Sequence, residues 1–147
     1  ASTTASSTGT VVAPIAIANA GNLVFGSFAA STGGSITVST SGARTVGGAV
    51  VGMSGVPSAA RFNVTGETGA AFSISVTADT DLTTTGGTMP FSFAADLTAG
   101  GAVTGTVTSG TLTAGAQSIY VGGTLTVAGA QVPGLYSGVI TATVEYN

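Results

Sequence analysis

Apolar and polar residues alternate along most of this chain, which is the period of a β-strand with one buried face. Phe62 and Val64, for example, share one side of the segment Arg61–Thr65. The alternating segments are also rich in β-branched and aromatic residues, which pleated surfaces favour. The pattern predicts strands at Ser35–Ser39, Arg61–Thr65, Ala71–Thr77, Met89–Leu97, Val103–Val107, Gln117–Val127 and Leu135–Tyr146.

Turn signals separate these segments. Pro133-Gly134 suits a type II turn, and glycine pairs tolerate the positive φ of hairpin turns. Gly122-Gly123 instead lies between two apolar stripes that continue each other, which predicts a bulge inside one strand. No segment of about ten residues carries a helical stripe. The chain is therefore predicted to be all-β, a sandwich of short strands, with glycine pairs at Gly33-Gly34, Gly47-Gly48, Gly86-Gly87, Gly100-Gly101 and Gly122-Gly123.

A further stripe lies near the N-terminus, where Val11, Ala13, Ile15 and Ile17 point one way if the segment is extended. Such a stripe needs a surface that covers it. Two arrangements satisfy this need. The segment either folds back as the first strand of its own domain or packs into another copy of the chain.

Charge is scarce, with 5% charged residues and a net charge of −3, against a typical charged share of about 25%. Arg44 and Arg61 are isolated cations, which excludes a nucleic-acid surface. No apolar run reaches the ~18 residues that span a bilayer. So few charges leave solubility to Ser and Thr hydroxyls, or imply that other copies cover much of the surface.

The start of the chain, Ala1-Ser2-Thr3, consists of small residues. Small residues flank the cleavage sites of secretory signals. The sequence therefore predicts a mature, exported chain whose secretory signal has been removed. The alternative is that the first residue is an arbitrary starting point and no signal was cleaved there. The absence of cysteine excludes disulfides and thiolate metal sites.

Candidate chemistry is sparse as well. Without His, Cys or Lys, no base is present to activate a Ser or Thr nucleophile. Asp79 and Asp81 are weak candidates for a calcium site, because Ca²⁺ takes six to eight oxygen ligands, and a solvated turn is the favoured interpretation. We therefore expect neither an enzyme nor a cofactor.

Two motifs carry a resemblance to known families: GNLVFGSF at Gly21–Phe28 and PGLYSGVITATVEYN at Pro133–Asn147. Together they resemble bacterial pilins, in particular chaperone–usher fimbrial subunits of the spore-coat-protein-U type. Over nearly its full length the chain resembles more closely a family of Ala/Gly/Thr-rich secreted bacterial domains of unknown function.

The pilin resemblance implies an immunoglobulin-like sandwich that lacks its final strand and is completed by the N-terminal strand of a neighbour. On this chain it implies a donor segment at Thr8–Ala18, a connector at Asn19–Asn22, and a division into 1–22 and 23–147. Donor residues are then Val11, Ala13, Ile15 and Ile17. The edge of the acceptor groove is formed by Tyr136, Ile140, Ala142, Val144 and Tyr146.

The expected function is a structural subunit of an extracellular bacterial filament, with other copies of the chain as partners. The resemblance also implies a periplasmic chaperone and an outer-membrane usher during export, although the chain lacks the disulfide pair of such subunits. The alternative is a self-contained secreted adhesin or carbohydrate-binding module. That alternative predicts a stable monomer with a cluster of exposed aromatic side chains.

Overall fold

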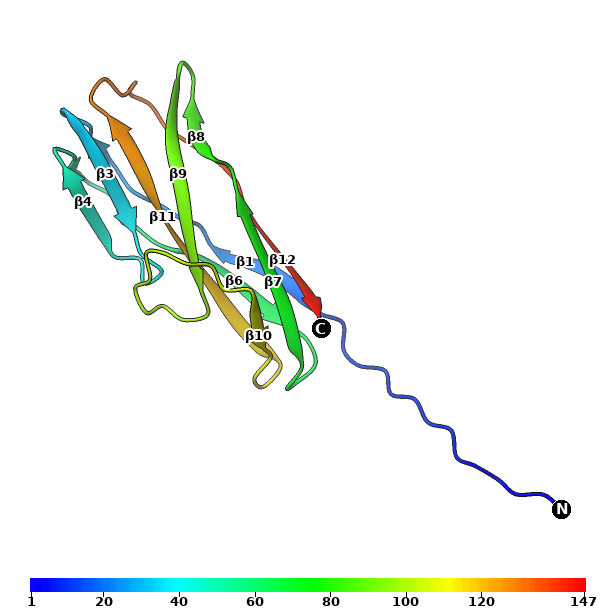
Figure 1. Cartoon of the computed structure of the whole chain (residues 1–147). Helices are drawn as coiled ribbons and strands as arrows, with labels where there is room; N and C mark the ends of the chain where they lie inside the picture. Colours follow the sequence, from blue (N-terminus) through cyan, green and yellow to red (C-terminus); the bar gives the residue numbers. More distant parts are fainter.

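The structure, a computed structural model, describes residues 1–147 and contains strands but no helix (Figure 1). The all-β prediction is therefore confirmed. No segment has the length and hydropathy of a membrane-spanning helix. The strands are β1 Ala16–Gly21, β2 Phe28–Ala29, β3 Gly33–Val38, β4 Arg44–Gly48, β5 Val51–Gly52, β6 Ala60–Thr65, β7 Ala71–Ala78, β8 Asp81–Thr84, β9 Gly87–Asp96, β10 Ser109–Thr111, β11 Ala116–Ala128 and β12 Ile140–Tyr146.

The larger sheet is built around β11. One edge of β11 pairs first with β6 and then with β3, and the other edge pairs with β9. The partner changes at Gly122 and Gly123, where a Cβ on Gly122 would collide with the backbone of Val38 and Ser39. This glycine pair thus lies inside one strand, as predicted. The predicted bulge is wrong, because the register with β9 continues without a shift.

The smaller sheet has the order β10-β7-β12 and packs against the larger one. Phe72, Ile74 and Val76 alternate along β7 and are buried against Val64 and Ile119 of the larger sheet. A second buried cluster includes Ile36, Val38, Met89 and Leu125. Antiparallel sheets with the core between them are consistent with a β-sandwich.

Most of the predicted strands are present with small differences at their ends. The prediction at Val103–Val107 is wrong, because this segment is a loop that makes only a single bridge, between Thr106 and Ala95. The last predicted strand is shorter than expected. Only Ile140–Tyr146 is paired as a strand, whereas Leu135 and Val139 lie before it and are exposed.

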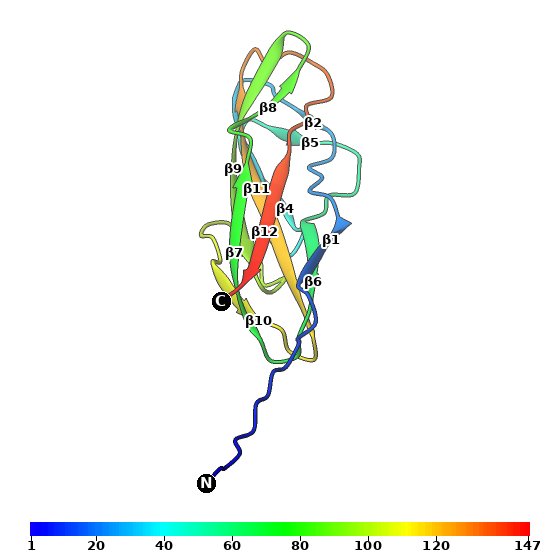
Figure 2. The same ribbon diagram turned by 90° about the vertical axis from the view of Figure 1, so that its right-hand side faces the viewer.

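The N-terminal stripe divides at Pro14. Residues 1–15 lie outside any strand and their first part projects away from the domain (Figures 1 and 2). β1 pairs with β6 of its own chain, which places Ile17 opposite the buried Val64. Ile15 and Ile17 accordingly pack on their own core, whereas Val11 and Ala13 are exposed. This corrects the expected donor segment Thr8–Ala18 and the expected connector Asn19–Asn22, because β1 begins at Ala16 and continues to Gly21 as the first strand of its own domain.

Candidate functional site

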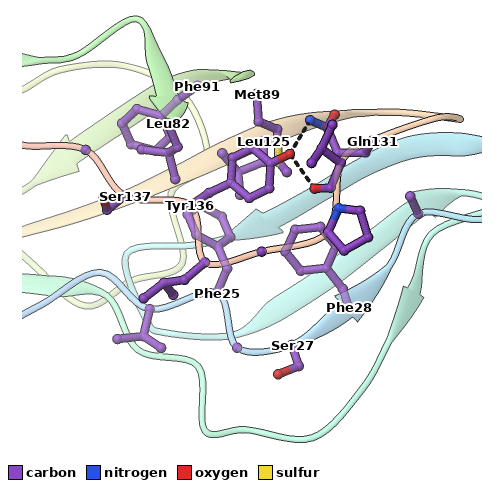
Figure 3. Close-up of a pocket in the computed structure, with 18 of the residues that line it drawn as sticks. Phe25, Ser27, Phe28, Leu82, Met89, Phe91, Leu125, Gln131, Tyr136 and Ser137 are labelled. Atoms are coloured by element: carbon purple, nitrogen blue, oxygen red, sulfur yellow. Dashed lines mark hydrogen bonds between the residues drawn. The ribbon is translucent and has the colours of Figure 1, made fainter. Parts of the chain in front are cut away.

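An apolar groove opens between two segments, Leu23–Ala30, which includes β2, and Gln131–Ile140, which leads into β12 (Figure 3). Its volume is about 870 Å³. The floor is formed by core side chains, since Phe25, Met89 and Leu125 are buried. Phe25 also meets Phe91 edge-to-face, with 6.3 Å between the ring centroids. The groove is thus a preformed apolar surface of the size that ligand and peptide sites have.

One wall of the groove is held by Arg44. Its Nη1 donates hydrogen bonds to the carbonyl oxygens of Phe25 at 3.0 Å and Ser27 at 3.3 Å, and its Nη2 donates to the Met53 carbonyl at 2.9 Å. A planar guanidinium can bridge several carbonyls in this way. Sequence reasoning missed this role, because the partners lie far from Arg44 along the chain.

The opposite wall is held by Tyr136 and Gln131 (Figure 3). The Tyr136 hydroxyl donates to the Val132 carbonyl at 2.5 Å and accepts a hydrogen bond from Gln131 Nε2 at 2.9 Å. Gln131 Nε2 also donates to the Thr88 carbonyl at 2.8 Å. Tyr136, a predicted acceptor residue, therefore lines the groove, although from the loop that precedes β12.

The other predicted acceptor residues lie on one face of β12. Ile140, Ala142, Val144 and Tyr146 all point toward the core, yet each is only half-buried. β12 pairs with β7 on one side and with no strand on the other. β1 is likewise an outer strand, paired with β6 alone. Figure 2 shows these two outer strands on the same side of the molecule.

The N-terminal segment leaves the domain at the far end of β12, where three hydrogen bonds form what we call the junction clamp. The Ala13 amide donates to Glu67 Oε2 at 3.0 Å. The Tyr146 hydroxyl donates to the Ala13 carbonyl at 2.6 Å and accepts from the Glu67 amide at 2.8 Å. The sequence offers no signal for this clamp, because its residues come from distant parts of the chain. We call residues 1–13 the tail.

Exposed large apolar side chains gather in two places. Val11 and Val12 lie on the tail, and Val11 is 99% exposed. A second group lies on or beside the groove walls and is called the groove rim; only Val46 and Val103 belong to neither place. The rim residues are Val24, Val51, Met53, Val56, Val132, Leu135 and Val139.

The remaining candidates have structural surroundings. Asp79 Oδ2 accepts a hydrogen bond from the Val139 amide at 2.9 Å, which ties the end of β7 to the start of β12. Asp81 begins β8, and no group of three or more acidic side chains gathers anywhere in the chain. On the outer face of the larger sheet, the Arg61 guanidinium lies 5.6 Å from the centroid of the Tyr120 ring.

Residues 15–146 match the family described as "Domain of unknown function (DUF4402)". The chain belongs to this family. The DUF4402 match includes β1, the groove and β12, and it begins directly after Pro14. No curated protein and no solved structure matches the chain. The resemblance to a domain family of unknown function is thereby confirmed, while the likeness to pilins remains a prediction.

Proposed function

We propose that this protein is the repeating subunit of an extracellular bacterial filament, in which the tail of one copy lies along β12 and the groove of the next. The observation that carries the proposal is that one chain has two separate exposed apolar surfaces. One is a free extended tail, and the other is an open groove beside an unpaired strand edge.

In this proposal the sandwich is of the immunoglobulin-like, pilin-like kind and lacks one strand. The vacant position lies between β12 and β1, the two outer strands of the two sheets. Ile15 and Ile17 then flank the acceptor site of their own domain, because Ile17 is fixed by the β1–β6 pairing and Ile15 packs on the same core. The donor is the part of the tail before Ala13. Val11 is thus kept from the sequence-based hypothesis, whereas Ala13 is held by the junction clamp of its own domain.

Elementary energetics make such strand addition feasible. Burying Val11 contributes about 1.5–3 kcal/mol, and each backbone hydrogen bond along the free edge of β12 contributes about 1 kcal/mol net. Association costs at least ~4 kcal/mol in lost freedom. An extended tail reaches about 43 Å at ~3.3 Å per residue, so there is room for many such bonds. Strand addition to an exposed sheet edge is a general recognition mode.

The geometry of the two surfaces favours a chain of copies. Ile140, at the N-terminal end of β12, lines the groove. Tyr146, at the C-terminal end of β12, contacts Ala13, where the tail leaves the domain. Donor and acceptor thus lie at opposite ends of the same strand. A head-to-tail contact between different surfaces generates a filament when the rotation between copies does not close a ring.

The alternative of a self-contained adhesin or carbohydrate-binding module gains no specific support. All aromatic side chains of the domain are buried or half-buried, so none presents a fully exposed platform. The partners expected during export, a periplasmic chaperone and an outer-membrane usher, and the location at the cell surface stay predictions that accompany the filament hypothesis.

Deletion of the tail tests the proposal. The intact chain is expected to form filaments in negative-stain electron microscopy and to elute as large species in size-exclusion chromatography. The chain without residues 1–13 should remain a folded monomer, because only Ala13 of the tail contacts the domain through hydrogen bonds. A chain with an intact tail and the substitution Val103→Ser serves as control. Filaments that persist after the deletion would refute the proposal.

A further inference from the structure

We infer that the tail of the neighbouring copy lies antiparallel to β12, with Val11 in the apolar groove and the tip of the tail toward Tyr146. The junction clamp then fixes where one copy ends and the next begins. This inference rests on the proposed function and adds to it the register and direction of the donated segment.

The composition of the tail sets the first constraint. Residues 1–10 are Ala, Ser, Thr and Gly, whereas Val11 and Val12 are its only large apolar residues. The apolar part is therefore confined to the end that lies next to the domain from which the tail departs. A donor of this kind gains most when that end meets the most apolar part of the acceptor.

The acceptor is polarised in the same way. Its most apolar part is the groove, where Phe25, Met89 and Leu125 form the floor. Toward Tyr146 the acceptor continues as the free edge of β12, whose inward side chains Ala142, Val144 and Tyr146 are already half-buried against the core. When the tail enters from the groove end, Val11 meets the groove and the small residues follow the edge of β12. The largest apolar side chains of the tail then meet the part of the acceptor with the most open apolar surface.

Closure of a tail onto its own domain reverses this match. A tail that turned back at Pro14 would place Val11 beside Tyr146 and its tip, with Ala1 and Ala5, in the groove. The groove would then be filled by small residues and keep much of its apolar surface exposed. The order of residues in the tail thus favours a neighbour over self-closure.

The junction clamp leaves only a short linker between neighbouring domains. Because Ala13 is bound at both its amide and its carbonyl, Val12 is the first residue that is free to leave the domain. If Val11 occupies the groove of the next copy, the end of the first domain that carries the junction clamp must lie close to the groove rim of the second. Leu135, which is 87% exposed on that rim, is positioned to be covered by such a contact.

Cysteine cross-linking of the full-length chain tests the direction, since the chain contains no cysteine of its own. The pair Val12→Cys with Leu135→Cys is expected to form disulfides between copies and to give a ladder on a non-reducing gel. The pair Thr3→Cys with Leu135→Cys should give no ladder. A ladder from the second pair but not the first, in chains that still form tail-dependent filaments, would overturn the inference and leave the proposed function intact.

A substitution in the tail tests the role of Val11. Val11→Ser should raise the concentration needed for assembly about tenfold, because it removes a buried apolar side chain. Val103→Ser, at an exposed valine outside the tail and the rim, is the matched control and should leave assembly unchanged. Equal effects of both substitutions would contradict the inference. If neither the parent chain nor any variant assembles and no pair cross-links, the proposed function fails as well.

Discussion

The two longest strands of the smaller sheet, β7 and β12, are paired in register but differ in burial. Opposite residues are Phe72 and Tyr146, Ile74 and Val144, and Val76 and Ala142. The β7 residues are 0%, 5% and 7% exposed, whereas their partners on β12 are only half-buried. Both strands alternate equally well in sequence, so local propensity does not explain the difference. The position in the sheet does.

β7 lies between β10 and β12, and the larger sheet covers it. β12 has a neighbour on one side only, and its inward side chains lie at the margin of the core. An alternating stripe therefore specifies which face of a strand points inward, but not whether the same chain supplies all the residues that cover that face. The half-buried face of β12 is the part of the molecule where a further strand would add most.

Truncation of the paired residues Ile74 and Val144 should have the largest effect on stability. Ile74→Ala is expected to lower the free energy of unfolding of the monomer by about 3 kcal/mol, because a buried isoleucine leaves a cavity. Val144→Ala should cost about 1 kcal/mol, since its side chain is already partly hydrated. Urea denaturation of the tail-deleted chain measures both. Equal losses would mean that β12 is as well covered as β7.

Loss of Arg44 should have the next largest effect. Arg44→Ala removes three hydrogen bonds to carbonyl groups and is expected to lower the free energy of unfolding by about 2 kcal/mol, because hydrogen bonds from a charged donor are strong. The groove wall at Phe25–Ser27 should become mobile in nuclear magnetic resonance relaxation. Arg61→Ala is the matched control. This arginine has only exposed contacts, with Ser118 and the Tyr120 ring, and its loss should cost less than about 1 kcal/mol and leave the groove wall rigid. A wall that stays rigid without Arg44 would show that packing alone holds it.

The smallest effect is expected at the junction clamp. Tyr146→Phe keeps the ring that packs on the core and removes a hydroxyl with two hydrogen bonds, which should cost about 1 kcal/mol in the intact chain. Amide exchange at Ala13 should accelerate. Tyr120→Phe, whose hydroxyl makes no hydrogen bond within the chain, is the control and should leave that exchange unchanged. An unaltered exchange rate at Ala13 in the Tyr146 variant would show that the Tyr146 hydroxyl does not hold Ala13.

Much of the fold follows from alternation alone. β6, β7, β9 and β11 were predicted because their inward residues alternate over five or more positions. The prediction at Val103–Val107 failed although it also alternates, since Gly105 takes a φ of 90° and the segment has only one bridge to Ala95. The short strands β2 and β5 gave no signal, because a two-residue pairing has no period to detect.

Only part of the site could be predicted. The inward face of β12 follows from the sequence pattern, but that pattern places Val11 and Ile17 in one stripe and does not separate the exposed Val11 from Ile17, which packs on its own core. A period of two cannot say whether β6 of the same chain or another copy covers it. Arg44, Gln131 and the clamp depend on contacts between distant segments. Gly66 illustrates this, because it leaves space for the Tyr146 hydroxyl from far along the chain.

The most direct test is titration of the tail-deleted chain with a synthetic peptide of residues 1–13, followed residue by residue by nuclear magnetic resonance. We expect saturable one-to-one binding, with chemical-shift changes along β12 and the groove walls and little change on β10. Binding should be lost when Val11 and Val12 are replaced by serine. No binding, or changes that fall on the outer face of the larger sheet around Tyr120, would contradict it.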